Sequence, residues 1–167
     1  VRKLVLNDVG PVIQWQALER IGTYLGKVQE FANLLQAADA MWAISQSFGP
    51  HTPAQWLELS RHMVKPVAGK ADAVTLHYDP AIAVQFKAVT AEIAAQGEAA
   101  VWQMYDSLSA QTLLLRGAQS DLLSPQTAAA MTQRGPKATL VEFAGVGHAP
   151  TLIADDQVNT VASFLLE

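Results

Sequence analysis

The fold is decided by residues 112–121, which read Thr-Leu-Leu-Leu-Arg-Gly-Ala-Gln-Ser-Asp. The stretch begins with an almost entirely apolar run, and a glycine and a polar loop follow directly. An uninterrupted apolar run that ends in turn-forming residues is typical of a strand buried on both faces, as in a parallel sheet. The stretch therefore predicts a buried strand that ends at Arg116-Gly117 and carries Asp121 on the loop behind it.

Two more segments have the same pattern of an apolar run closed by turn-forming residues. They are residues 4–6, followed by Asn-Asp-Val-Gly-Pro, and residues 138–143, followed by a glycine-spaced loop that ends at His148. Apolar residues at helical spacing predict helices over 125–134 and from 155 to about 165. Alternating strands and helices indicate a parallel sheet with right-handed crossovers. So few helices cannot easily cover both faces of a three-stranded sheet, so we expect the sheet to be incomplete.

The region between the first two strands is predicted to be nearly all helix. Asn33 and Thr52 are followed three residues later by glutamine, which is typical of capped helix starts. A loop is expected over 65–72 and a brief extended piece over 73–78. The insertion is too long for an ordinary crossover and is interpreted as a lid. The predicted organisation is a core strand and loop in residues 1–14, a helical cap or lid in 15–109, and the rest of the core in 110–167.

Composition limits the classes of function. The 167 residues are 50% hydrophobic, and the net charge of −4 gives no electrostatic reason to bind nucleic acid. The absence of cysteine excludes disulfides and zinc-thiolate sites, so a cytoplasmic location is expected. The apolar runs are too short to cross a membrane, and no membrane partner is predicted. The sequence begins with Val1 and enters a strand-like run at once, which we interpret as a cut through a longer chain.

Three polar residues follow the predicted strands at the sheet edge where reactive groups gather. Asp8, Asp121 and His148 each lie in a loop after a strand, and such loops converge over one crevice in open α/β sheets. A carboxylate that accepts the Nδ1 proton of a histidine fixes its tautomer and leaves Nε2 to act as a general base. The sequence thus predicts an acid and a base at one edge of the sheet.

The same segments resemble the α/β-hydrolase superfamily. Residues 113–121 are similar to its strand and acid loop, residues 143–150 to its histidine loop, and residues 4–11 to the strand that precedes its lid. The resemblance implies an α/β fold, namely the C-terminal part of an α/β-hydrolase fold with three parallel strands, flanking helices and a helical cap insertion. The strands would be the sixth, seventh and eighth of eight. The esterase and enol-lactonase-like group is the most similar.

By this resemblance Asp121 is the acid and His148 the base of a catalytic triad. Some members of the family place the acid after the sixth strand, which makes Asp8 the alternative acid. The second interpretation, which rests on the neighbouring residues alone, is that Asp8 is a carboxylate that caps an Asn-Asp turn. Both interpretations of Asp8 remain open at this point.

The nucleophile that the family requires is missing from these residues. No serine lies in a Gly-x-Ser-x-Gly motif; the serines are Ser45, Ser47, Ser60, Ser107, Ser109, Ser120, Ser124 and Ser163. The nucleophile and the oxyanion hole are therefore expected upstream, and the chain alone is expected to be inactive. The predicted activity of the parent protein is hydrolysis of a small ester, lactone or related acyl substrate by a serine nucleophile, without a cofactor.

Other interpretations share this fold. An aspartate nucleophile would suit dehalogenation, other relatives cleave carbon–carbon or peptide bonds, and a protein without a nucleophile would be a binding module. No metal is predicted, because His51, His62 and His77 lack metal-ligand spacing. The expected partner is a small-molecule substrate, and self-association through the exposed first strand is also predicted.

Overall fold

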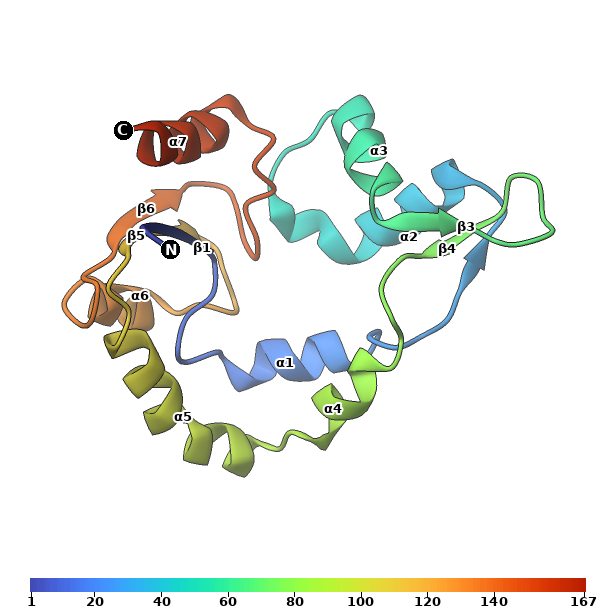
Figure 1. Cartoon of the computed structure of the whole chain (residues 1–167). Helices are drawn as coiled ribbons and strands as arrows, with labels where there is room; N and C mark the ends of the chain where they lie inside the picture. The colour runs from blue at the N-terminus through green and yellow to red at the C-terminus, as the bar shows by residue number, and fades with distance from the viewer. The chain divides into compact units, whose positions relative to one another are not determined.

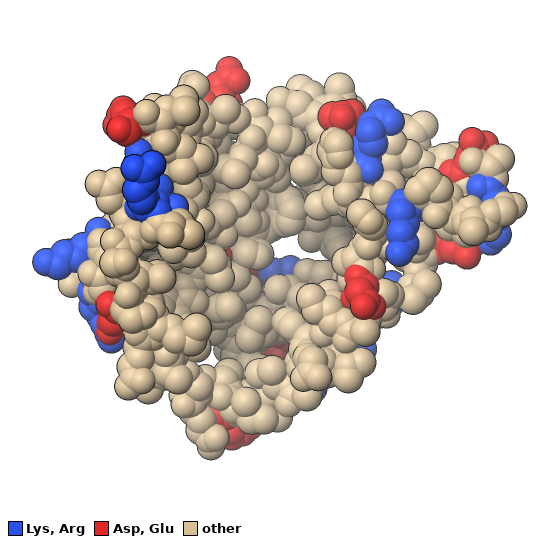
Figure 2. All heavy atoms as spheres, in the orientation of Figure 1, with Lys and Arg blue, Asp and Glu red and all other residues tan.

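The computed structural model describes residues 1–167, which form two compact units. The first unit contains Val1–Arg20, Ser47–Gly49 and Val89–Glu167, and the second contains Ile21–Gln46 and Pro50–Ala88. Figure 1 traces the elements of both units along the chain. None of the helices has the length and apolar character needed to cross a membrane. Figure 2 shows charged side chains of both signs dispersed among uncharged atoms rather than gathered in one patch.

The first unit is built on a parallel sheet with the strand order β1-β5-β6. Its strands are β1 (Lys3–Asn7), β5 (Gln111–Gly117) and β6 (Thr139–Phe143). Leu114 lies opposite both Leu6 and Leu140, and it is fully buried. The central strand is therefore the apolar run that the sequence predicts, and the parallel pairing of the three strands is confirmed.

Helices cover both faces of this sheet. The helices that belong wholly or partly to the unit are α1 (Trp15–Gly22), α5 (Ala91–Asp106), α6 (Pro125–Met131) and α7 (Asp155–Leu166). On one face Trp102, Tyr105 and Met131 pack with Leu114. On the other face Val161 and Phe164 of α7 pack against the cluster that contains Leu113, Leu115 and Phe143. Side chains that alternate along β5 thus enter two separate cores.

Tyr105 shows how α5 is fixed to the core. Its hydroxyl donates a hydrogen bond to the backbone oxygen of Met131 at 2.7 Å. Burial raises the pKa of the Tyr105 hydroxyl, so the donor proton stays in place at neutral pH. Because α5 packs in the first unit, the predicted cap of residues 15–109 includes segments of both units, and its role as a lid remains a prediction.

The second unit differs from the nearly all-helical region that the sequence predicts. Its helices are α2 (Leu34–Ser45), α3 (Pro53–Arg61) and α4 (Ile82–Ala88). The 3-10 helix η1 (Gln46–Phe48) follows α2, and its last two residues belong to the first unit. It also contains an antiparallel sheet of order β2-β4-β3, formed by β2 (Glu30–Phe31), β4 (Val74–Leu76) and β3 (Val64–Pro66). These strands are too short for a periodic pattern, which is why the sequence predicts only an extended piece near β4.

The caps of α2 and α3 are confirmed. The Asn33 side chain accepts from the backbone N–H of Gln36 at 3.0 Å. At α3, Thr52 accepts from the Gln55 backbone N–H while the Gln55 side chain accepts from the N–H of Thr52. These reciprocal bonds satisfy backbone donors that the first helical turn leaves unpaired.

Strand β1 pairs with β5 on one side and lies at the edge of its sheet. The N–H of Asp8 and the carbonyl of Arg2 both hydrogen-bond to β5. Because the backbone groups of successive residues point alternately to the two sides of a strand, Val5 directs its N–H and C=O to the open edge. Such an edge can pair with another strand. We expect the chain to self-associate at micromolar concentration, as measured by light scattering.

The control for this expectation is Val5→Pro, which removes a donor from the open edge and leaves the bonds to β5 in place. It should shift the chain toward monomer. A wild-type chain that is monomeric at the same concentration would contradict the expected association.

Candidate active site

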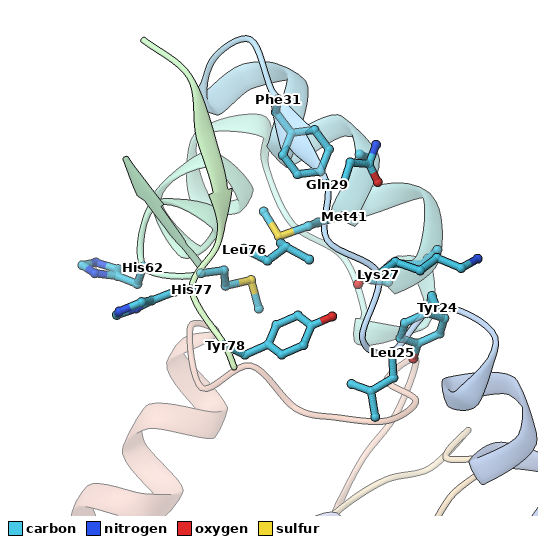
Figure 3. Close-up of a pocket in the computed structure, with 14 residues that line it drawn as sticks. Tyr24, Leu25, Lys27, Gln29, Phe31, Met41, His62, Leu76, His77 and Tyr78 are labelled. Carbon is cyan, nitrogen blue, oxygen red and sulfur yellow. The ribbon is translucent and has the colours of Figure 1, made fainter. Parts of the chain in front are cut away.

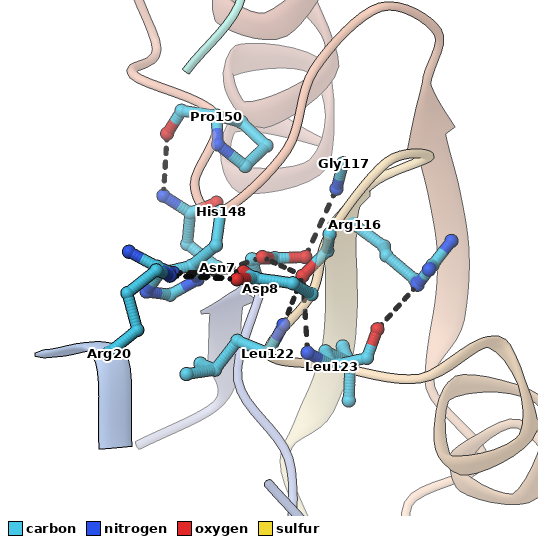
Figure 4. Close-up of polar contacts among 11 residues, drawn as sticks. Asn7, Asp8, Arg20, Arg116, Gly117, Leu122, Leu123, His148 and Pro150 are labelled. Carbon is cyan, nitrogen blue, oxygen red and sulfur yellow. Dashed lines mark hydrogen bonds and ion pairs between the residues drawn. The ribbon is translucent and has the colours of Figure 1, made fainter. Parts of the chain in front are cut away.

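Asp8 stands at the point where β1 ends and its loop begins. Its backbone has a φ of 56°, in the left-handed region that aspartate tolerates better than most residues. The Asp8 N–H donates to the carbonyl of Leu115 at 2.8 Å, which fixes the residue beside the central strand. The side chain is fully buried, and Figure 4 shows its polar contacts. An Asn-Asp turn thus places a carboxylate inside the protein rather than at its surface.

Three donors converge on the Asp8 carboxylate. Oδ2 lies 2.8 Å from Nδ1 of His148 and 2.6 Å from the hydroxyl oxygen of Ser120. Oδ1 accepts from the backbone N–H of Gly117 at 3.1 Å. A buried charge is tolerated only when hydrogen bonds replace the water that it loses. The donors therefore allow an ionised carboxylate at this position.

The loop after β6 brings His148 to Asp8. The N–H of Gly147 donates to the carbonyl of Ser47 at 2.5 Å, and the side-chain amide of Asn7 donates to the carbonyl of Pro150 at 2.9 Å. His148 is 27% exposed while its partner carboxylate is 0% exposed. Because Asp8 accepts at Nδ1, the other ring nitrogen, Nε2, is the one that can act on a reacting group.

Asp121 lies elsewhere. Its carboxylate forms a two-pronged ion pair with Arg20 at the end of α1, with distances of 3.0 Å to Nε and 3.1 Å to Nη2. Both side chains are about half exposed, at 41% and 51%. The expected pairing of Asp121 with His148 is not observed, because the guanidinium holds Asp121 and the buried carboxylate beside the imidazole is that of Asp8. The structure therefore brings His148 together with Asp8, the alternative acid, and not with Asp121.

The loop after β5 touches the histidine loop directly. Gln119 N–H donates to the carbonyl of Val146 at 2.9 Å. A Cβ atom on Gly117 would collide with the carbonyl oxygens of Val146 and Gly147. The close approach of the two loops therefore depends on glycine at position 117.

We expect Gly117→Ala to lower the free energy of unfolding by about 1–3 kcal/mol, the usual cost of forcing an atom into a packed region. The matched control is Gly97→Ala in α5, where an added Cβ meets nothing within 4 Å. The control should raise stability by about 0.5–1 kcal/mol, because alanine favours helix. Urea unfolding measures both, and a Gly117→Ala protein as stable as wild type would contradict the close contact.

Arg116 is a site residue that the sequence does not reveal. It is only 3% exposed, its Nε donates to the carbonyl of Leu123 at 2.9 Å, and its Nη1 pairs with Glu142 at 2.5 Å. These bonds connect the loop after β5 to β5 itself and to β6. The only sign in the sequence is an arginine at the end of an otherwise apolar run.

The remaining histidines lie in the second unit. His51 contacts Trp42 and Trp56 edge to face, with ring centroids 6.2 and 5.7 Å away. His62 and His77 line a pocket of about 620 Å³ (Figure 3). Two of the residues that line this pocket, Phe31 and Met41, are buried and apolar. The pocket belongs to the second unit alone.

Comparison with known proteins shows what the chain resembles in sequence and fold. No protein-family model matches the chain. The 3-hydroxybutyrate-oligomer hydrolase of Cupriavidus necator is 46% identical over 98% of the chain. A crystal structure of an α/β hydrolase from Novosphingobium aromaticivorans superposes over 99% of the chain with a TM-score of 0.80 and 33% identity. The chain has the fold of part of an α/β hydrolase.

The crystal structure of a protein from Rickettsia typhi also superposes on 99% of the chain, with a TM-score of 0.79 and 26% identity. The chain spans 56% of the length of the C. necator relative, 57% of the N. aromaticivorans structure and 53% of the R. typhi structure. The resemblance of the sequence to the α/β-hydrolase superfamily is therefore confirmed. The prediction that the chain forms part of an α/β-hydrolase fold is confirmed as well.

Proposed function

We propose that Asp8 and His148 are the acid and base of a hydrolase that cleaves small esters through an acyl-enzyme. The observation that carries this proposal is the 2.8 Å contact between Nδ1 of a partly exposed His148 and a fully buried Asp8 carboxylate. Burial keeps the carboxylate away from solvent, and partial exposure leaves the imidazole within reach of a substrate. These are the properties of the orienting acid and the general base in a triad.

In this proposal Nε2 of His148 takes the proton of a serine hydroxyl as the serine oxygen attacks the ester carbonyl. The ester C–O bond then breaks, and the imidazolium returns the proton to the departing alcohol oxygen. In the second half, His148 takes a proton from water, and the hydroxide formed attacks the acyl group. The bond between the acyl group and the serine oxygen then breaks, and the imidazolium returns its proton to that oxygen. Asp8 stabilises the imidazolium in both halves without taking up the proton itself.

The serine of this mechanism is proposed to lie outside these residues. No serine of the chain occupies a Gly-x-Ser-x-Gly turn. Since the chain spans only about half the length of its relatives, the rest of such a protein has room for the nucleophile and the oxyanion hole. We accordingly expect the chain alone to show no turnover.

The proposed substrate class is supported by the relative named as a 3-hydroxybutyrate-oligomer hydrolase. An oligomer of a hydroxy acid is joined by ester bonds, and ester cleavage is the chemistry that an imidazole base and an activated hydroxyl perform. We propose short hydroxy-acid esters as substrates, with simple esters and lactones as further candidates. The reaction requires no cofactor in this proposal.

The test uses the longer protein that contains these 167 residues. We expect a serine-directed phosphonate to label it once and to abolish hydrolysis of the linear dimer of 3-hydroxybutyrate. Each dimer yields two molecules of 3-hydroxybutyrate, which can be followed by chromatography. Absence of both labelling and turnover in a folded protein would contradict the proposed serine hydrolase.

A further inference from the structure

The hydroxyl of Ser120 is part of the environment of the Asp8–His148 pair. Ser120 immediately precedes Asp121 in the loop after β5, and it is half-buried. Its Oγ lies 2.6 Å from Oδ2 of Asp8. This distance is in the range of a charge-assisted O–H···O⁻ bond. The loop after β5 thus reaches the site through its serine, and the neighbouring Asp121 pairs with Arg20.

The direction of the Ser120 hydroxyl is fixed by the backbone around it. Oγ accepts from the N–H groups of Leu122 at 3.2 Å and Leu123 at 3.1 Å. A hydroxyl has one proton and two lone pairs, and an ionised carboxylate can only accept. With both lone pairs of Oγ engaged by amides, the proton points to Asp8.

The same carboxylate oxygen, Oδ2, receives bonds from Ser120 and from His148. The other oxygen, Oδ1, is held by the N–H of Gly117. The orientation of the carboxylate plane is therefore set by two donors, Gly117 and Ser120, that do not take part in proton transfer. His148 contacts an acceptor whose position is already determined.

We propose that Ser120 is a positioning residue that acts through Asp8 to hold His148 as the Nδ1–H tautomer. Its importance for catalysis rests on the proposed function, but the tautomer itself does not. Loss of the hydroxyl frees one side of the carboxylate, so Oδ2 no longer stays aligned with the imidazole N–H. The loop backbone remains held by Arg116, which bonds to the carbonyl of Leu123.

The test is the ratio of the two neutral tautomers of His148 in this chain, measured by ¹⁵N NMR of the imidazole at a pH where the ring is neutral. We expect the wild-type ring to be mainly Nδ1–H. In Ser120→Ala the ratio of Nδ1–H to Nε2–H should fall about tenfold, the effect of one hydrogen bond to a charged group. Ser120→Thr keeps the hydroxyl and should retain the wild-type ratio.

Ser120→Cys provides a second variant of nearly the same shape, since a thiol is only a weak donor. It should shift the ratio in the same direction as alanine, and it decides the matter if the alanine variant does not fold. An unchanged ratio in a folded Ser120→Ala or Ser120→Cys protein would overturn the proposal. Because the measurement needs neither nucleophile nor substrate, failure of ester hydrolysis would leave its result standing.

Discussion

Replacing Asp8 by asparagine should lower kcat about 10⁴-fold in a longer protein that carries the proposed serine nucleophile. The amide has nearly the size of the carboxylate, so the packing around this fully buried side chain is preserved. The amide, however, can present a donor to Nδ1 of His148 and favours the wrong tautomer. It also cannot stabilise the imidazolium that forms when the base takes a proton. Turnover of the 3-hydroxybutyrate dimer measures the loss.

The matched control is Asp121→Asn, the same chemical change at the position where the family resemblance places the acid. This variant breaks only an ion pair between half-exposed side chains. Exposed pairs of this kind contribute about 0–1 kcal/mol to stability. We expect kcat to stay within about threefold of wild type, which corresponds to a rise of less than about 1 kcal/mol in the activation barrier. A large loss in Asp121→Asn with near-normal turnover in Asp8→Asn would reverse our assignment of the acid.

His148→Ala is expected to have the largest effect, lowering kcat by about 10⁵ to 10⁶-fold in the longer protein. The variant removes the only group in the proposal that moves protons, in both acylation and deacylation. His62→Ala is a suitable control, because that side chain is 77% exposed and pairs with Glu58, whose side chain is itself 63% exposed. The control should retain wild-type turnover.

A double variant, Asp8→Asn with His148→Ala, makes this prediction sharper. Residues that act as one unit show losses that do not add, because an orienting acid has no role once its base is gone. We expect the double variant to lose no more than His148→Ala alone. Losses that multiply would show that Asp8 acts on the reaction independently of the imidazole.

The framework of the first unit could be predicted because its signals are local. The apolar runs at β1, β5 and β6 and the loops behind them are visible in the sequence, and the parallel order follows from alternating helices and strands. His148 could be named because glycine and small residues surround it at the end of a strand. The short strands of the second unit have no such signal, since their pairing joins residues far apart in the chain.

The choice between the two acids could not be made from the sequence. Both Asp8 and Asp121 follow strands whose carboxyl ends lie at one edge of the sheet. What distinguishes them is the direction of each side chain, which depends on Arg20 for Asp121 and on the left-handed backbone of Asp8. The contact between Arg20 and Asp121 joins residues 101 positions apart, and no periodic pattern in the sequence indicates it.

The most direct measurement is the imidazole Nδ1–H proton of His148, observed by NMR in this chain and in its two asparagine variants. A hydrogen bond to a carboxylate moves that proton far downfield and protects it from exchange. Our account predicts that the signal disappears in Asp8→Asn and persists in Asp121→Asn. A signal that survives in Asp8→Asn and is lost in Asp121→Asn would contradict it.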